Sequence, residues 1–328
     1  MSVPSLGIMF RCNYPPEHLR DYARRAEAYG YDELWIVEDC FWGGGIASTA
    51  TALAVTESIT VGLGIVPAVV RNAAFVAMEF ATLARLYPGR FLPGFGHGVT
   101  SWMRQVGELP ASQIKAIEEV AVAVRALLHG ERVTTNGQQV KLDGVKLDLP
   151  PSVPPLISLG VRGPKSLALS GRVADGTIVP EVSAPAYISV ARQQIEQGVS
   201  AAGHGRPHRL TVYSFCSVDS DPVAARNRVR PMLAQFMASG DLNAQLAPLG
   251  LEGEVKAMLA NGGQDYLREN MPDSWIAQLA VAGTPDDCAA MIYQLGEAGA
   301  DSVVLTPLPE QPIDQIDTFA REVLPLLK

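Results

Sequence analysis

Short apolar runs alternate along this chain with longer segments whose apolar residues recur every three to four positions. Residues 60–66 and 91–96 are apolar runs of strand length, and residues 72–87 between them have the length and spacing of a helix. A strand, a helix and a second strand in this order predict two parallel strands joined by a crossover. Both strands end in turns rich in small or polar residues, where a parallel barrel gathers its functional groups.

The same unit recurs along the rest of the chain. We predict further strands at residues 6–10, 33–37, 156–159, 177–179, 210–218 and 302–305, and further helices at 17–29, 46–55, 114–129, 165–173, 187–202 and 313–326. Thr284, Pro285, Asp286 and Asp287 predict one more helix start, because Thr caps, Pro suits the first turn and acids favour the positive end. Eight strand–helix pairs predict an α/β fold, a (β/α)8 TIM barrel with insertions. A doubly wound parallel sheet is the alternative, because periodicity does not reveal whether a sheet closes.

Two segments fall outside the repeat within what we expect to be a single domain over residues 1–328. Residues 133–149 contain Asn136-Gly137 between β-compatible residues and predict a hairpin outside the barrel. Residues 230–275 read as helical patches broken by glycines. This helical insertion either covers a substrate at the mouth or is a packed excursion or subunit contact.

Composition narrows the class of protein. Apolar residues make up 48% and charged residues 18%, which is a globular profile. A net charge of −8 without a basic run argues against nucleic acid, and no apolar run is long enough to predict a membrane span. The chain start lacks a signal-peptide pattern, and the four cysteines show no C-x-x-C spacing, so we expect a reduced, cytoplasmic protein without a metal site.

Two carboxylates, Glu38 and Asp39, directly follow the second predicted strand. They point to opposite sides if the strand continues, so they are not automatically a catalytic pair. One of them orients a cofactor or moves a proton, or else caps the next helix or pairs with an arginine. The neighbouring Cys40 lines the pocket or is a small buried residue.

Glycines mark the ends of the third and fourth strands. Gly64 precedes Ile65 inside a strand, where glycine indicates a bulge or a close backbone approach. His97 lies between Gly96 and Gly98, where it acts as a donor or acid near a ligand, or only shapes the loop.

A turn after the fifth strand is the best physical signal for a phosphorylated cofactor. Free N–H groups at a helix start bind anions, and two cations add positive charge. The residues of this turn are Gly160, Val161, Arg162, Gly163, Pro164 and Lys165. The alternative is an ordinary strand–helix turn with two solvated cations.

Together these motifs resemble the luciferase-like oxidoreductases. The resemblance is carried by ELWIVED at 33–39, VGLGI at 61–65, ATLARLYPGRF at 81–91, GHG at 96–98 and GPKSLALSGRVADG at 163–176. Several of these segments look like the coenzyme F420-dependent branch, especially its methylenetetrahydromethanopterin reductase-like members. The resemblance implies the (β/α)8 barrel over nearly the whole chain.

The resemblance also implies roles for single residues. A cis peptide at Gly64–Ile65 would lie behind the central ring, Gly96, His97 and Gly98 would touch the ring, and the turn from Gly160 to Pro164 would hold the cofactor phosphate. Asp39 matches the aspartate of the family's Asp–His pair.

Two positions depart from the family pattern. Cys40 replaces the histidine of that pair, and Val99 replaces the glutamate of the sugar-phosphate-oxidising members. The chain should therefore not be a sugar-6-phosphate dehydrogenase of that kind. Its proton donor must be reassigned to His97, Glu38 or Asp39.

From the resemblance we expect an oxidoreductase that transfers a hydride between coenzyme F420 and a small organic substrate. One alternative is an FMN-dependent monooxygenase of the same superfamily, and another is a non-catalytic flavin-binding barrel. We also expect a homodimer, with neither nucleic acid nor membrane as a partner.

Overall fold

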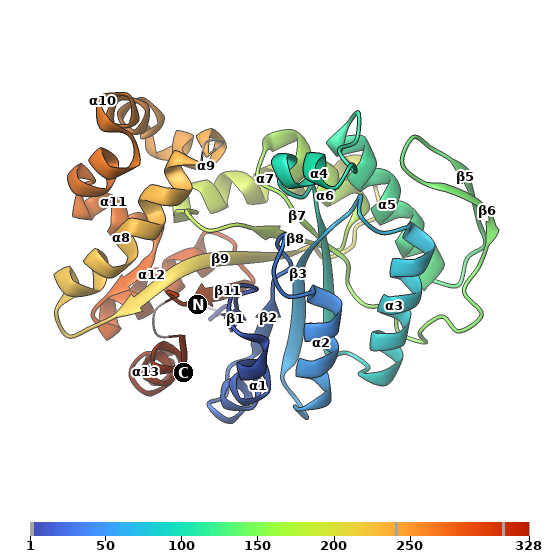
Figure 1. Cartoon of the computed structure of the whole chain (residues 1–328), viewed down its shortest axis with the longest axis horizontal. Coiled ribbons are helices and arrows are strands. Elements are labelled where there is room, and N and C mark those ends of the chain that lie inside the picture. The colour runs from blue at the N-terminus through green and yellow to red at the C-terminus, as the bar shows by residue number, and fades with distance from the viewer. Residues whose placement is uncertain (1–2, 240–241, 310–311, 328) are drawn as a thin grey trace.

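The computed structural model describes residues 3–239, 242–309 and 312–327. Its central feature is a closed ring of parallel strands (Figure 1). In ring order these are β1 (Ser5–Phe10), β2 (Glu33–Ile36), β3 (Thr60–Pro67), β4 (Phe91–Gly96), β7 (Ser158–Gly160), β8 (Gly176–Val179), β9 (Arg209–Val218) and β11 (Ser302–Thr306). Pairing of β8 with β9 and of β11 with β1 closes the ring. The predicted TIM barrel is confirmed, and the alternative of an open doubly wound sheet is wrong.

Helices surround the barrel, and most begin within two residues of the predicted positions. They are α1 (Leu19–Ala28), α2 (Gly45–Ala54), α3 (Ala73–Leu86), α5 (Gln113–Leu128), α6 (Pro164–Val173), α7 (Pro185–Ala202), α12 (Pro285–Glu297) and α13 (Pro312–Glu322). Shorter elements flank some of them. They are the 3-10 helices η1 (Pro16–His18) and η3 (Leu324–Leu327) and the short α-helix α4 (Thr100–Gln105). The predicted cap at Thr284 is confirmed, because Thr284 and Asp287 form a reciprocal capping box.

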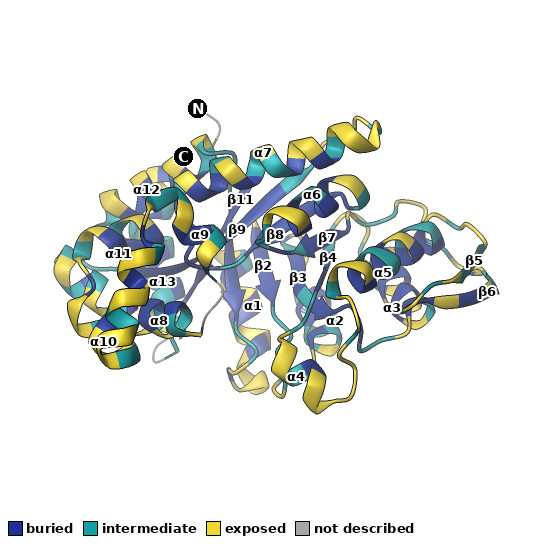
Figure 2. Cartoon of the chain, turned by 90° about the horizontal axis from the view of Figure 1, so that it is seen from above, coloured by how far each residue is buried: buried dark blue, intermediate teal, exposed yellow. Residues whose placement is uncertain are grey.

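The barrel interior is filled by side chains rather than open. Alternate strand residues point inward, and Met9, Trp35, Ile178, Tyr213 and Val304 form one buried cluster there. The intervening residues pack outward against the helices, which carry the exposed surface (Figure 2). This alternation determines which residues beyond each strand end face the mouth of the barrel.

The predicted hairpin is confirmed and lies outside the barrel (Figure 1). Strands β5 (Val133–Asn136) and β6 (Lys141–Val145) form a separate two-stranded sheet, and Gly137 N donates to Val140 O across the turn. One strand was not predicted: β10 (Val281–Gly283) pairs with the end of β9. Three residues are too few to show a periodicity of their own.

The helical insertion is longer than predicted, because α8 (Pro222–Ala238) begins before residue 230. It continues through α9 (Asn243–Leu246), η2 (Ala247–Leu249), α10 (Glu252–Asn270) and α11 (Asp273–Leu279). Figure 1 shows these helices on the opposite side of the molecule from the hairpin. They share an apolar cluster of their own with β9 and the loop after β8.

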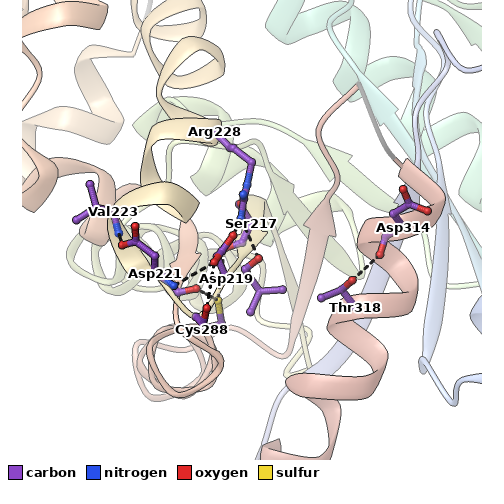
Figure 3. Close-up of polar contacts among 11 residues, drawn as sticks. Ser217, Asp219, Asp221, Val223, Arg228, Cys288, Asp314 and Thr318 are labelled. Atoms are coloured by element: carbon purple, nitrogen blue, oxygen red, sulfur yellow. Dashed lines mark hydrogen bonds and ion pairs between the residues drawn. The ribbon is translucent and has the colours of Figure 1, made fainter.

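Polar contacts fix the start of α8. Asp221 accepts a hydrogen bond from Val223 N at 2.9 Å, and Arg228 bridges Ser217 and Asp219 (Figure 3). The insertion is therefore anchored where it leaves β9. No helix in the described part of the chain is long and apolar enough to cross a membrane.

Candidate active site

A cis peptide joins Gly64 and Ile65 in β3, as predicted. The pairing of β3 with β4 shifts register between Leu63 and Val66, so the strand bulges at this point. Tyr213 Oη donates a hydrogen bond to Gly64 O at 3.2 Å. A Cβ on Gly64 would lie 1.9 Å from that hydroxyl oxygen, so the contact requires glycine here.

The Ile65 side chain lies over the ends of two neighbouring strands. A Cβ on Gly96 would lie 2.4 Å from Ile65 Cδ1, and a Cβ on Gly160 would lie 2.6 Å from Ile65 Cγ2. Both glycines therefore make room for the bulge. Backbone of β3, β4 and β7 is gathered at one part of the mouth.

Glu38 and Asp39 point in different directions, as predicted from their adjacency. Glu38 faces the helices: Arg71 donates to its two carboxylate oxygens at 2.6 and 2.7 Å, and Gly45 N at the start of α2 donates to Oε2 at 2.8 Å. Both of the alternatives weighed against catalysis, an arginine partner and a helix start, are present at Glu38.

Asp39 lies at the barrel mouth and is partly buried. Its Oδ2 accepts a hydrogen bond from Cys12 Sγ at 3.8 Å. Burial raises the pKa of Asp39, and the nearby carboxylate of Glu181 raises it further. Burial, followed by the charge of Asp39, raises the pKa of Cys12 to about 12, so Cys12 is a thiol donor at neutral pH.

Cys40 packs against an apolar cluster of Val69, Met103 and Ala116. Burial raises the pKa of its thiol, and Glu38 acts in the same direction. A second cis peptide, between Cys40 and Phe41, was not predicted. Cys40 is therefore a weakly polar thiol at the edge of the mouth. It does not titrate in the pH range in which a histidine at this position would.

His97 is attached to the start of α6. Its Nε2 lies 3.3 Å from Ser166 Oγ. Burial lowers the pKa of His97, and the Arg162 cation acts in the same direction. A neutral imidazole therefore links the loop after β4 to the turn after β7.

The turn after β7 forms the start of α6, as predicted. Gly163 is the N-cap with Pro164 in the first turn, and the carbonyl of Arg162 accepts from Tyr187 Oη at 2.7 Å. The half-buried Arg162 side chain makes no ion pair within the described residues, and a Cβ on Gly163 would meet open space. Anions bind where backbone N–H groups are free and positive charge lies nearby. This turn offers the first-turn N–H groups of α6, the Arg162 cation and open space beside Gly163.

Residues 9–302 match the model of the luciferase-like monooxygenase family. The chain belongs to this family. A 5,10-methylenetetrahydromethanopterin reductase of Methanolobus tindarius is 31% identical, covering 98% of this chain and 99% of that protein.

Two further luciferase-like relatives carry the coenzyme in their names. An F420-dependent glucose-6-phosphate dehydrogenase of Kineococcus radiotolerans is 27% identical over 96% of this chain and 94% of that protein. The coenzyme F420-dependent tetrahydromethanopterin reductase of Methanopyrus kandleri has the same fold, with a TM-score of 0.85 at 23% identity and full coverage of both chains. The predicted family resemblance is confirmed.

Two residues of this luciferase-like mouth were missed from the sequence. Glu181, 8% exposed, follows β8 and accepts a hydrogen bond from Thr306 Oγ1 at 2.9 Å. Cys12 follows β1 and contacts Asp39. The sequence does indicate Glu181, because, like Glu38, it is an acidic residue just after a barrel strand. In the described ranges no group of three His, Cys, Asp or Glu residues is arranged to hold a metal ion.

Proposed function

We propose that this protein is an oxidoreductase that transfers a hydride between the deazaflavin coenzyme F420 and a small organic substrate. The observation that carries the proposal is the match over nearly the whole chain to two relatives. One is a 5,10-methylenetetrahydromethanopterin reductase, and the other is a dehydrogenase whose name states that it is F420-dependent. The mouth described above supports it with a bulged strand, an anion-binding turn and a buried acid.

The residues present fit a phosphorylated, flat cofactor. Arg162 and the first-turn N–H groups of α6 would hold the phosphate, and the cis Gly64–Ile65 peptide would support the ring. When bound, coenzyme F420 supplies or accepts the hydride.

The three candidate catalytic residues take different roles in this proposal. Asp39 holds the proton, because it is a partly buried carboxyl at the mouth and desolvation raises its pKa. Glu38 is a positioning residue that connects Arg71 to the start of α2. His97 positions the anion-binding turn through Ser166. Gly96, Gly98 and Val161 belong to the two loops that would enclose the cofactor.

An absorbance titration tests the cofactor assignment. Purified protein is titrated with oxidised F420 and, separately, with FMN. We expect saturable binding of F420 and much weaker binding of FMN. Tighter binding of FMN would replace the proposal with the flavin-dependent monooxygenase that the family name includes. Binding of F420 without turnover across carbonyl and imine substrates would leave only a non-catalytic barrel.

The substrate of the sugar-phosphate-oxidising relatives is not proposed for this chain. Val99 stands where those members carry a glutamate, and it is 45% exposed at the start of α4. An apolar side chain at this position offers no proton acceptor. Glucose 6-phosphate should therefore not be oxidised.

We propose a homodimer formed through α3. Phe75, Met78 and Leu86 are 66%, 52% and 64% exposed and lie on one face of this helix. Val122 adds an exposed apolar side chain on α5, which packs beside α3. A second copy of this face would bury these side chains.

We also propose that the protein is located in the cytoplasm. All four cysteines, Cys12, Cys40, Cys216 and Cys288, are free thiols. Unpaired cysteines are typical of proteins from reducing compartments.

A further inference from the structure

A glutamate side chain lies on the floor of the barrel mouth. Glu181 follows β8, and its Oε1 accepts a hydrogen bond at 2.9 Å from Thr306 Oγ1 at the end of β11, although β9 separates these strands in the ring. Thr306 shares a strand face with Val304 of the interior cluster, and its Oγ1 also lies 3.8 Å from Met9 Sδ. The Glu181 carboxylate therefore lies where the packed barrel interior ends.

The protein's own side chains satisfy this carboxylate only in part. Glu181 is 8% exposed, and within the described ranges Thr306 provides its one hydrogen bond from a side chain or backbone donor. A carboxylate offers about four acceptor positions. Burial of a carboxylate is costly unless cations or several donors surround it. The remaining acceptor positions of Glu181 therefore suit a ligand that brings N–H donors and positive charge.

No cation among the described residues is paired with Glu181. Arg71 is held by Glu38, at 2.6 and 2.7 Å from its two carboxylate oxygens. Arg11, just beyond β1, has no carboxylate oxygen within 4.0 Å in the same part of the chain. The net charge of the chain is −8, so the electrostatic field of the protein favours the approach of cations.

Given the function proposed above, on which this inference rests, we propose that Glu181 binds a cationic nitrogen group of the substrate, an ammonium or an amidinium. A planar cation with parallel N–H groups matches the two oxygens of a carboxylate. Glu181 takes no part in the hydride step and instead selects the substrate by its charge. The substrate of this oxidoreductase is then an organic cation, and neutral or anionic analogues of the same size bind more weakly.

The helical insertion holds Glu181 in place. Gln245 on α9 is fully buried, and its Nε2 lies 2.8 Å from Glu181 O, 3.2 Å from Val182 O and 2.9 Å from Ser183 Oγ. Val182 has φ of 65°, a left-handed conformation that a β-branched residue adopts only when its surroundings impose it. Gln245 is therefore a positioning residue for the substrate-binding Glu181.

Three probes of similar shape test recognition by charge: benzamidine, which is cationic, benzamide, which is neutral, and benzoate, which is anionic. The full chain is labelled with ¹³C at methionine methyl groups, and the Met9 signal, assigned by its absence in Met9→Leu, reports on the floor of the mouth. Exposed Met78 on α3 is the reference. We expect benzamidine to shift the Met9 signal saturably, with about tenfold or greater preference over the other two probes. Equal affinities, or no shift of Met9, would overturn the inference.

A charge-removing variant identifies the residue that binds the probe. Glu181→Gln keeps the size of the side chain, and it should lower benzamidine affinity by about tenfold while benzamide affinity stays the same. Glu79→Gln, at an exposed acid on α3, is the matched control and should bind all three probes as the unchanged chain does. Unchanged benzamidine affinity in folded Glu181→Gln would overturn the inference.

A third variant leaves Glu181 itself intact. Gln245→Met removes the amide donors and should reduce the preference for benzamidine over benzamide, whereas Gln278→Met, at an exposed position of the same insertion, should preserve it. Equal preferences in both variants would overturn the positioning role. Titration with F420 separates the two proposals. Benzamidine preference through Glu181 without F420 binding would reject the proposed function alone, and F420 binding without charge preference would reject this inference alone.

Discussion

Arg71 donates to both carboxylate oxygens of Glu38, at 2.6 and 2.7 Å, on the outer side of the barrel wall. The side chain of Glu38 is 12% exposed and that of Arg71 is 27% exposed, so the pair is partly shielded from water. The adjacent residue, Asp39, faces the mouth. Two adjacent residues thus have different roles: Glu38 belongs to a structural ion pair, and Asp39 is a candidate proton carrier.

Glu38→Gln should destabilise the fold more than it affects cofactor binding. The variant loses charge-assisted hydrogen bonds to Arg71, and we expect the free energy of unfolding to fall by about 2 kcal/mol. Urea denaturation measures the loss. Glu79→Gln is the matched control, because Glu79 is exposed and reaches Arg71 only at 3.9 Å. Unchanged stability with lost turnover would return Glu38 to a catalytic role.

Arg162→Ala should weaken the binding of F420. Removal of an unpaired cation beside the phosphate should cost about 1–3 kcal/mol of binding free energy. The absorbance titration measures it. Arg172→Ala, at the exposed end of the same helix and paired with Glu118, should bind normally. Equal affinity in both variants would mean that side-chain charge does not hold the phosphate.

His97→Ala should reduce cofactor affinity more than the rate of hydride transfer at saturation. The imidazole Nε2 lies 3.3 Å from Ser166 Oγ in the first turn of α6, so its loss should loosen the turn after β7 that we propose to hold the phosphate. Ser166→Ala should act in the same direction. Single-turnover absorbance kinetics separate affinity from rate. A rate loss of about 10²-fold at saturating coenzyme would instead make His97 the acid–base group.

Stability should fall as the solution is acidified from pH of about 6.5 toward 4. His208 lies 2.8 Å from Thr177 Oγ1, and burial, assisted by Arg192, lowers its pKa to about 4. In this pH range His208 is protonated in the unfolded chain and neutral in the folded chain. Acid therefore favours unfolding, by up to about 3 kcal/mol.

Urea denaturation at several pH values measures this loss, and His208→Gln should flatten the dependence. His129→Gln, on the surface at the end of α5, should not. A dependence equally steep in His208→Gln would exclude His208 as its source.

Phe75→Asp should convert the proposed homodimer to a monomer. The variant places a charge in the exposed apolar face of α3, where burial against a second copy would be costly. Light scattering after gel filtration gives the mass. Val190→Asp, an exposed apolar position on α7, is the control. A monomeric wild-type chain would exclude the dimer.

Local patterns determined most of the secondary structure and part of the site. The spacing of apolar residues predicted the strands and helices of the barrel, because those periods follow from backbone geometry alone. The capping box at Thr284 and the hairpin turn at Asn136-Gly137 were predicted because their contacts span a few residues. Family resemblance, rather than periodicity, predicted the cis peptide at Gly64–Ile65.

Other features depended on chain segments far apart in the sequence. That Gly96 and Gly160 accommodate Ile65 follows from the pairing of three strands around the bulge. The hydrogen bonds from buried Gln245 to the loop after β8 follow from packing of the insertion against the barrel. A sequence indicates which face of a strand a side chain occupies. Only the closed barrel decides which side chains it meets across the mouth, because that depends on strand order and register.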